Sequence, residues 1–436
     1  VAGAGQTVVL GLPLDVQSMA AGDAERLGRP EAGQHARRVA RVEGAPAGDT
    51  SGGGRGGGAQ DPPALDRQIA PLIDLIATAQ RPVFIAGRGA TRRAHDARVA
   101  LTALADRTGA LLAVSAAARG LFAGDPWYLD VSGGFATPLA AELIASADLV
   151  VAWGSTLNMW TTRHGRLIRP DTRVAHVDLA AGTLGIPRAV DVAISGDLID
   201  VARRALALLA PRDHASASTW RTPALRARIA AEGRWRSVPF RDETGHGKID
   251  PRALTIALDD ALPAERTVAV DSGNFMGYPA MFLAVPDAAG FCFTQAFQSI
   301  GLGLASAIGA AVARPERLTV AALGDGGFLM SAVELVTAVR LGLPLLVVIY
   351  NDAAYGAEVH HFGPHGHPLD TVTFADTDLA AIARGFGCAA ATVRSAADLD
   401  PVRDWLAGPR DRPLVIDAKI VSSHPSWWLE EAFRGH

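Results

Sequence analysis

The sequence contains little that would mark a secreted, membrane-embedded or nucleic-acid-binding protein. Only two of its 436 residues are cysteines, Cys292 and Cys388, and they form no CxxC pair. This scarcity indicates a reduced, cytoplasmic setting. The longest apolar stretch, residues 300–313, is shorter than the roughly 18 residues a membrane-spanning helix requires, so no membrane association is expected. The 41 basic and 45 acidic residues nearly balance, which argues against nucleic acid as a partner.

Apolar residues, by contrast, are abundant, at 49% of the chain against 20% charged residues. Segments with strand character alternate with segments of helical periodicity: strands are expected at 82–86, 149–153 and 173–178, and a helix at 94–108. This alternation predicts an α/β protein in which helices cover both faces of parallel sheets. The fold class that we expect is two doubly wound parallel-sheet domains, one central and one C-terminal, plus a remnant strand of a third domain.

Shifts in composition predict the domain boundaries. The run SGGGRGGGAQDPP (51–63) cannot bury apolar area, so it indicates a flexible linker. A second linker is expected where prolines and mixed charges accumulate. The predicted division is a domain remnant at 1–17, a linker at 18–63, a central domain at 64–210, a linker at 211–247, a C-terminal domain at 248–421 and a tail at 422–436.

Three helices are expected around the C-terminal sheet. Asp250 precedes a proline and predicts the N-cap of the first helix. Residues 300–313 predict the second helix. Residues 329–341 predict the third, with Leu335 and Val336 facing the sheet.

Residues 318–352 predict a β-α-β unit with a polar turn at the end of each strand. Because its two strands are parallel, Asp325 and Asp352 are expected beyond the same carboxyl-terminal edge, where open α/β sheets bind ligands. The unit consists of a strand at 318–323, the turn Gly324-Asp325-Gly326-Gly327, the helix at 329–341 and a strand at 345–350 that leads into Asn351-Asp352.

Two carboxylates at one sheet edge indicate a hard divalent cation such as Mg²⁺, which relieves their repulsion. Phosphate oxygens could complete the coordination of this ion. Gly324, Gly326 and Gly327 would expose backbone N–H groups to such an anion at the positive end of the following helix. An ordinary Gly-Asp turn between strand and helix is the alternative that so short a motif allows.

These motifs resemble those of thiamine-diphosphate-dependent enzymes of the acetolactate synthase and pyruvate decarboxylase group. The family signature is GDG followed, about two dozen residues later, by a double asparagine. Here the interval is 352 − 325 = 27 residues, and Asp352 takes the place of the second asparagine. Segments 7–17, 298–310 and 343–356 are similar to the last strand of the family's N-terminal domain, to its glycine-rich helix and to its double-asparagine strand.

The resemblance implies roles for individual residues. Asp325 and Asp352 would bind Mg²⁺ through their side chains, and Ala354 through its carbonyl. Ile300 would be the apolar wedge that bends the cofactor, although an isoleucine there also fits ordinary core packing. The residues implied around the cofactor are Gly273, Asn274, Gln298, Gly324, Gly326, Gly327, Tyr355 and Gly356, with the carbonyl of Gln298 accepting from the pyrimidine amino group.

The same resemblance implies a decarboxylase or carboligase that acts on a 2-oxo acid such as pyruvate, assembled as a homodimer or homotetramer. Some members hold FAD or an ADP group in the central domain. In this sequence Gly87-Arg88-Gly89-Ala90 follows a strand but lacks the GxGxxG spacing, so we interpret this turn as structural and leave FAD open. The absence of GxGxxG also disfavours an NAD-dependent dehydrogenase.

Two departures from the family bear on activity. The family's catalytic glutamate lies in the N-terminal domain, of which only the final strand is similar to residues 1–17, so no residue is assigned that role. Cofactor binding without turnover is therefore expected unless another chain supplies the domain, and a non-catalytic binding protein is the alternative. Residues 357–361 replace the Met-Val…Gln-Trp run of biosynthetic acetolactate synthases, which indicates a different substrate. Glu358 and His360 there could transfer protons or be ordinary polar residues of a loop.

Overall fold

The computed structural model describes residues 62–180, 184–185, 189–209, 220–297 and 299–433. The predicted remnant at 1–17, nearly all of the predicted linker at 18–63, and Gln298 lie outside the described residues. Every feature below belongs to the compact unit formed by residues 60–436.

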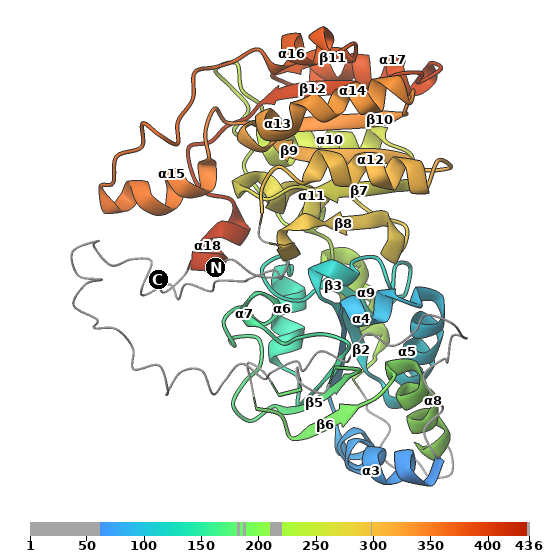
Figure 1. Cartoon of the computed structure of the whole chain (residues 1–436). Helices are drawn as coiled ribbons and strands as arrows, with labels where there is room; N and C mark the ends of the chain where they lie inside the picture. Colours follow the sequence, from blue (N-terminus) through green and yellow to red (C-terminus); the bar gives the residue numbers. More distant parts are fainter. Residues whose placement is uncertain (1–61, 181–183, 186–188, 210–219, 298, 434–436) are drawn as a thin grey trace, which may run out of the picture. The chain divides into compact units, whose positions relative to one another are not determined.

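The central domain is built on a six-stranded sheet in which every pairing is parallel. The predicted strands at 82–86, 149–153 and 173–178 are confirmed. The chain winds outward in both directions from the centre, so the order reverses between β1 and β4. The strand order is β3 (Tyr128–Val131), β2 (Leu111–Val114), β1 (Pro82–Ala86), β4 (Leu149–Trp153), β5 (Arg173–Asp178) and β6 (Val192–Ser195) (Figure 1).

Helices cover both faces of this sheet because successive side chains of a strand point in opposite directions. In β1, Phe84 packs on one face and Val83 and Ile85 on the other. Helices that belong to the Phe84 face are α3 (Pro62–Thr78), α5 (Ala94–Thr108) and α8 (Leu198–Leu209); α6 (Pro138–Ala145) and α9 (Pro223–Glu232) cover the opposite face. Two short helices, α4 (Arg88–Thr91) and α7 (Met159–Thr162), follow β1 and β4.

Part of the predicted second linker is folded against the central domain. Ile229 of α9 is buried in the core of that domain. Just after α9, the indole N–H of Trp235 donates to the backbone oxygen of Phe135 at 2.6 Å. Residues 220–237 therefore have a fixed place beside the central sheet.

The C-terminal domain contains a second six-stranded sheet, also parallel throughout. The central strand β10 is buried along its whole length and mostly apolar, as expected for a sheet covered on both faces. The sequence prediction of two doubly wound α/β domains is thereby confirmed. The order is β11 (Ala389–Val393), β12 (Leu414–Lys419), β10 (Leu345–Asn351), β9 (Leu318–Gly324), β7 (Arg266–Val270) and β8 (Phe291–Phe293) (Figure 1).

The helices around this sheet agree only in part with the prediction. Asp250 caps α10 by accepting from the N–H of Arg252 at 2.8 Å, as predicted. The predicted helix 300–313 begins three residues late, because Gly301 adopts a φ of +84°. The helices are α10 (Pro251–Ala261), α11 (Gly277–Phe282), α12 (Gly303–Ala313), α13 (Asp325–Ser331), α14 (Leu335–Arg340), α15 (Gly356–Phe362), α16 (Leu379–Gly385), α17 (Asp400–Ala407) and α18 (Trp427–Phe433).

The predicted single helix at 329–341 is wrong. The structure has α13 and α14, joined by a 3₁₀ turn at Ala332–Glu334. Ser331 has a φ of −124° before this turn, and a 3₁₀ turn has 3.0 residues per turn, so a 3.6-residue periodicity does not continue across it. Leu335 is buried as expected, but Val336 is 48% exposed.

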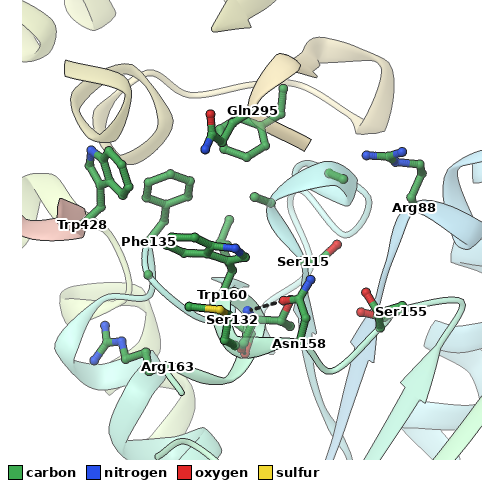
Figure 2. A pocket seen from close by; sticks show the side chains of 18 of the residues that line it. Arg88, Ser115, Ser132, Phe135, Ser155, Asn158, Trp160, Arg163, Gln295 and Trp428 are labelled. Carbon is green, nitrogen blue, oxygen red and sulfur yellow. Dashed lines mark hydrogen bonds between the residues drawn. The ribbon is translucent and has the colours of Figure 1, made fainter. Parts of the chain in front are cut away.

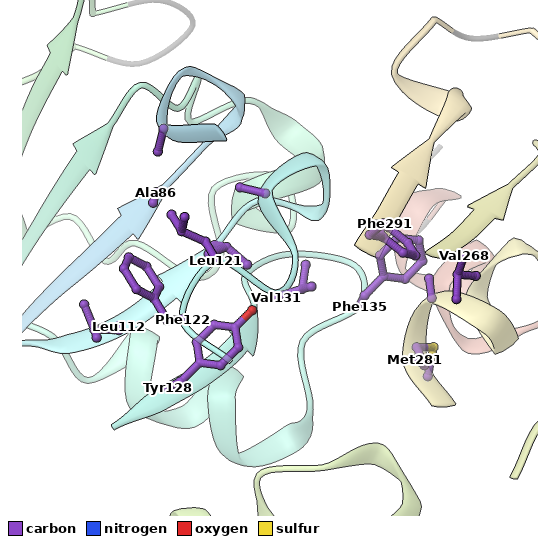
Figure 3. Close-up of a cluster of buried hydrophobic side chains, with 14 of the residues drawn as sticks. Ala86, Leu112, Leu121, Phe122, Tyr128, Val131, Phe135, Val268, Met281 and Phe291 are labelled. Carbon is purple, nitrogen blue, oxygen red and sulfur yellow. The ribbon is translucent and has the colours of Figure 1, made fainter. Parts of the chain in front are cut away.

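One hydrophobic cluster includes residues of both sheets. Figure 3 shows Phe135 of the central domain beside Val268, Met281 and Phe291 of the C-terminal domain. The Phe135 ring also meets that of Phe293 edge-on, with centroids 5.7 Å apart.

None of the described helices has the length and apolar character to cross a bilayer.

Candidate cofactor site

The two aspartates singled out by the sequence leave the same edge of the C-terminal sheet. β9 and β10 are neighbours, and their parallel register pairs Tyr350 with Gly324. Asp325 therefore follows the last paired residue of β9 directly, and Asp352 lies two residues beyond that of β10. The expected position of both aspartates beyond one sheet edge is confirmed. Their role as metal ligands stays a prediction.

Backbone N–H groups hold the Asp325 carboxylate in place. Asp325 is only 3% exposed. Its Oδ1 accepts from the N–H of Gly326 at 2.8 Å, and its Oδ2 accepts from that of Ala354 at 3.1 Å. The second bond joins the turn after β9 to the loop after β10. Ala353, between Asp352 and Ala354, has a φ of +58°, and this bend carries the N–H of Ala354 toward Asp325.

The two carboxylates are electrostatically costly in the absence of a cation. Burial raises the pKa of Asp325 to about 6. Burial and then the negative charge of Asp325 raise the pKa of Asp352 to about 8. Within the described residues no basic side chain forms an ion pair with either aspartate, and the charge of Lys248 lowers the pKa of Asp352 by a smaller effect. A divalent ion would supply the missing positive charge.

The donor set fits Mg²⁺ better than a transition metal. The described residues contain no group of three or more His, Cys, Asp or Glu side chains suited to a metal. A cation here would rely on two carboxylates, a backbone carbonyl and oxygens from its bound partner. Such an all-oxygen set, completed by phosphate, is typical of Mg²⁺.

Glycines allow the loops of this site to approach one another closely. A Cβ on Gly326 would lie 2.3 Å from Cε1 of Tyr355, and one on Gly356 would lie 2.3 Å from Oδ2 of Asp352. In the turn after the neighbouring strand β7, Gly273 has a φ of +147°, and the Phe275 ring lies beside both Gly273 and Gly324. Close packing within the chain therefore requires these glycines, in addition to any role of their backbone N–H groups in binding phosphate.

Asn274 lies in the site, but its oxygen atoms bind the C-terminal segment. The Oδ1 atom of Asn274 accepts from the N–H of Ser426 at 3.0 Å. Its backbone oxygen accepts from the Ser426 hydroxyl and from the indole N–H of Trp428, each at 2.7 Å. The predicted tail at 422–436 thus packs against the site through its described residues.

The remaining predicted residues surround the same edge. Tyr355 donates its backbone N–H to Val372 at 2.8 Å, and its ring packs edge-on against Phe374. Ile300 is 36% exposed in the loop before α12, so it lies outside the buried core of the described residues, and its role stays a prediction. Its side chain is free to contact a ligand.

Sequence reasoning missed a buried polar network behind the Asp352 loop. The Asn351 amide donates to Asp417 Oδ1 at 2.8 Å, and its Oδ1 accepts from the N–H of Ala353 at 3.1 Å. Lys419 lies 3.1 Å from Asp417 Oδ2. An aspartate and a lysine inside the apolar run of β12 were the available signal, because buried charges are retained where they are paired.

A second site lies at the carboxyl ends of the central strands. A cavity of about 590 Å³ is lined by Arg88 after β1, Ser155 after β4 and Trp160 of α7 (Figure 2). From the C-terminal domain, Gln295 and Trp428 also line it. Cavities of this size at the point where strand order reverses are the usual ligand sites of doubly wound sheets.

The glycines beside this cavity have a structural reason. A Cβ on Gly87 would lie 2.4 Å from the oxygen of Gly154, and one on Gly89 would lie 2.8 Å from its Cα. The turns after β1 and β4 therefore pack backbone to backbone. This agrees with the structural interpretation of the Gly87-Arg88-Gly89 turn.

Comparison with known proteins identifies both domains. Residues 271–418 match the model of the thiamine pyrophosphate enzyme C-terminal TPP binding domain. Residues 69–205 match that of the thiamine pyrophosphate enzyme central domain. The chain belongs to the thiamine pyrophosphate enzyme family. The predicted resemblance is thereby confirmed, and thiamine diphosphate is the cofactor that this family membership implies.

Three relatives show the range of this family. An acetolactate synthase large subunit from Parasynechococcus marenigrum is 30% identical over 76% of this chain and 53% of its own. A sulfoacetaldehyde acetyltransferase from Alcaligenes xylosoxydans xylosoxydans is 29% identical over 67% and 52%. A probable 2-ketoarginine decarboxylase from Pseudomonas aeruginosa is 33% identical over 78% and 58%. This thiamine pyrophosphate enzyme chain therefore spans slightly more than half the length of these relatives.

Proposed function

We propose that this chain binds thiamine diphosphate through Mg²⁺ and serves the decarboxylation of a 2-oxo acid or the transfer of its acyl group to a second carbonyl. The observation that carries the proposal is the pair of the buried Asp325 and the half-buried Asp352, two carboxylates at one sheet edge without a basic partner among the described residues. The relatives named as a synthase, an acetyltransferase and a probable decarboxylase support this range of reactions.

The residues of the site have distinct tasks in this proposal. Asp325 and Asp352 hold Mg²⁺, and the carbonyl of Ala354 completes the protein's share of its ligands. Ile300, exposed at the loop before α12, offers apolar contact to the ring system. When bound, thiamine diphosphate supplies a carbon nucleophile and electron sink for 2-oxo acids.

Binding is tested by calorimetry and by thermal unfolding with and without the cofactor and Mg²⁺. A ligand that binds only the folded state stabilises it by about 2.7 kcal/mol at 100 times its Kd. We expect the melting temperature to rise only when both components are present. An unchanged melting temperature together with no heat of binding would contradict the proposal.

A second candidate function is a cofactor-binding subunit without turnover of its own. It is supported by the match to the TPP binding domain, which implies cofactor binding without specifying turnover. Release of CO₂ from pyruvate and other 2-oxo acids, measured with and without an added pyrimidine-binding domain, distinguishes the two. Turnover by the chain alone supports the enzyme; turnover only with the added domain supports the subunit.

We further propose that the chain assembles as a homodimer or homotetramer. The support is a set of large apolar side chains on α13, the following turn and α14. Leu329, Met330, Val333 and Val336 are between 46% and 65% exposed. Exposed apolar groups of this kind are typical of protein interfaces. Sedimentation of the purified chain checks this, and a monomer at micromolar concentration would contradict it.

The cavity of the central domain suits a nucleotide such as FAD or an ADP-containing ligand. Arg88 can pair with a phosphate, and Trp160 can stack on a ring. The Ser155 hydroxyl is buried and has no hydrogen-bond partner within the described structure. We expect Arg88→Ala to weaken nucleotide binding about tenfold, the loss of one charge-assisted contact.

Titration of the purified chain with FAD and with ADP, followed by fluorescence, measures this effect. Arg403→Ala is a matched control, because Arg403 is exposed on α17 and pairs only with Asp400 among the described residues. Weak binding of both ligands to the unaltered chain would refute a nucleotide in this cavity.

A further inference from the structure

Asp271 is a buried carboxylate at the edge of the cofactor site to which no sequence motif assigns a role. It directly follows β7 and is 0% exposed. Its backbone N–H donates to Ala322 of β9 at 3.0 Å, so the residue still belongs to the sheet. No described basic side chain forms an ion pair with it. A charge buried in this way requires other compensation.

Backbone N–H groups from a distant loop provide that compensation. Asp271 Oδ1 accepts from the N–H of Ser272, and Oδ2 accepts from that of Gly301, each at 2.9 Å. Burial raises the pKa of Asp271, while the N–H groups of Ser272 and of residues 301–303 lower it by stabilising the carboxylate. Apart from Ser272, the N–H groups that stabilise this carboxylate thus belong to residues 301–303, where the chain enters α12.

This arrangement replaces the usual cap of a helix. The first N–H groups of any helix lack partners inside it. Leu302, at the N-cap of α12, forms no side-chain cap hydrogen bond. Asp271 supplies the acceptor from another strand, and its negative charge also faces the positive end of the helix.

Two glycines fit around the same carboxylate. A Cβ on Gly303 would lie 2.6 Å from the Cβ of Asp271, and one on Gly327 would lie 2.6 Å from its Oδ2. Gly327 follows Asp325 by two residues in the first turn of α13. One carboxylate therefore contacts the start of α12, which follows Ile300, and the start of α13, which carries Asp325.

We propose that Asp271 is a positioning residue that fixes the loop bearing Ile300 relative to the turn bearing Asp325. The loop turns its N–H groups inward to Asp271, while Ile300 and Leu302 remain 36% and 37% exposed on its outer side. In this proposal the position of Ile300 relative to the sheet edge with Asp325 is fixed in the apo protein, before the cofactor binds. The proposal rests on the proposed function for the identity of the ligand, but not for the geometry of the loop.

Hydrogen exchange of the apo protein tests the geometry directly. In Asp271→Asn the amide nitrogen faces the loop N–H groups and the charge is lost. We expect the amides of residues 301–303 to exchange about tenfold faster, the loss expected for a charge-assisted hydrogen bond. Asp250→Asn is the matched control, because Asp250 is also 0% exposed and also caps a helix. Unchanged exchange at 301–303 in Asp271→Asn overturns the proposal.

If Asp271→Asn does not fold, Gly303→Ala takes its place. The added methyl group would displace the carboxylate, whereas Gly309→Ala, on the same helix, meets no atom within 4 Å. Faster exchange at 301–303 in Gly303→Ala alone supports the proposal. Equal exchange in both alanine variants overturns it.

Cofactor affinity then tests the consequence. We expect Asp271→Asn to raise the Kd of thiamine diphosphate with Mg²⁺ about tenfold, and to have a smaller effect when Ile300 is already alanine. Additive effects would show that Asp271 does not act through Ile300. Absence of binding by the unaltered chain contradicts the proposed function, whereas the exchange experiment still decides the role of Asp271 in the loop.

Discussion

Replacing Asp325 by asparagine is expected to weaken the Mg²⁺-dependent binding of thiamine diphosphate about a hundredfold or more, because one of two anionic ligands is lost. The asparagine oxygen can keep one of the two hydrogen bonds, from Gly326 or from Ala354, while its amide nitrogen replaces the other acceptor oxygen. Isothermal titration calorimetry with cofactor and Mg²⁺ measures the change.

The same substitution is expected to stabilise the apo protein, since it removes the charge that raises the pKa of Asp352. Binding and stability thus change in opposite directions, which general damage to the fold would not produce. Asp404→Asn, at an exposed position of α17, is a control that leaves both quantities unchanged. Equal affinity of Asp325→Asn and the unaltered chain would show that Asp325 binds no metal.

The apo protein is expected to lose stability as the pH rises from about 4 to about 8. Burial raises the folded-state pKa of Asp325 to about 6. Burial and the negative charge of Asp325 raise that of Asp352 to about 8. Below the unfolded-state pKa both groups are protonated in both states, so no penalty exists. As the pH rises through the folded-state values, the unfolded chain binds fewer protons than the folded one and the free energy of unfolding falls.

A tenfold difference in proton affinity between the folded and unfolded chain corresponds to about 1.4 kcal/mol, so the loss amounts to several kcal/mol at pH 8. Urea denaturation at a series of pH values measures it, and Asp352→Asn should remove most of the slope. Cofactor binding with Mg²⁺ at pH 7 should also release about one proton, mostly from Asp352, detectable by calorimetry in buffers of different ionisation enthalpy. Identical pH dependence in Asp352→Asn and the unaltered chain would contradict this electrostatic account.

Local sequence patterns were sufficient to predict an element when the composition of that one segment shows whether it is buried. β1 and β10 are apolar runs of the length of a strand between turn residues, and such runs predict buried parallel strands. The cap of α10 was equally visible, because Asp250 and the proline after it are adjacent. The error at Val336 arose where helical periodicity was extended across the 3₁₀ turn at Ala332–Glu334, which has no distinct signature.

By itself, the sequence determined two parallel sheets and the exit of Asp325 and Asp352 from one edge, because parallel strands with short turns leave few other arrangements. Only the tertiary structure decided that Gly327 makes room for Asp271 and that Ile300 stands exposed. It also decided that the tail binds Asn274. These contacts join residues that are far apart in the sequence. The periodic pattern of one segment does not predict which distant residue it contacts.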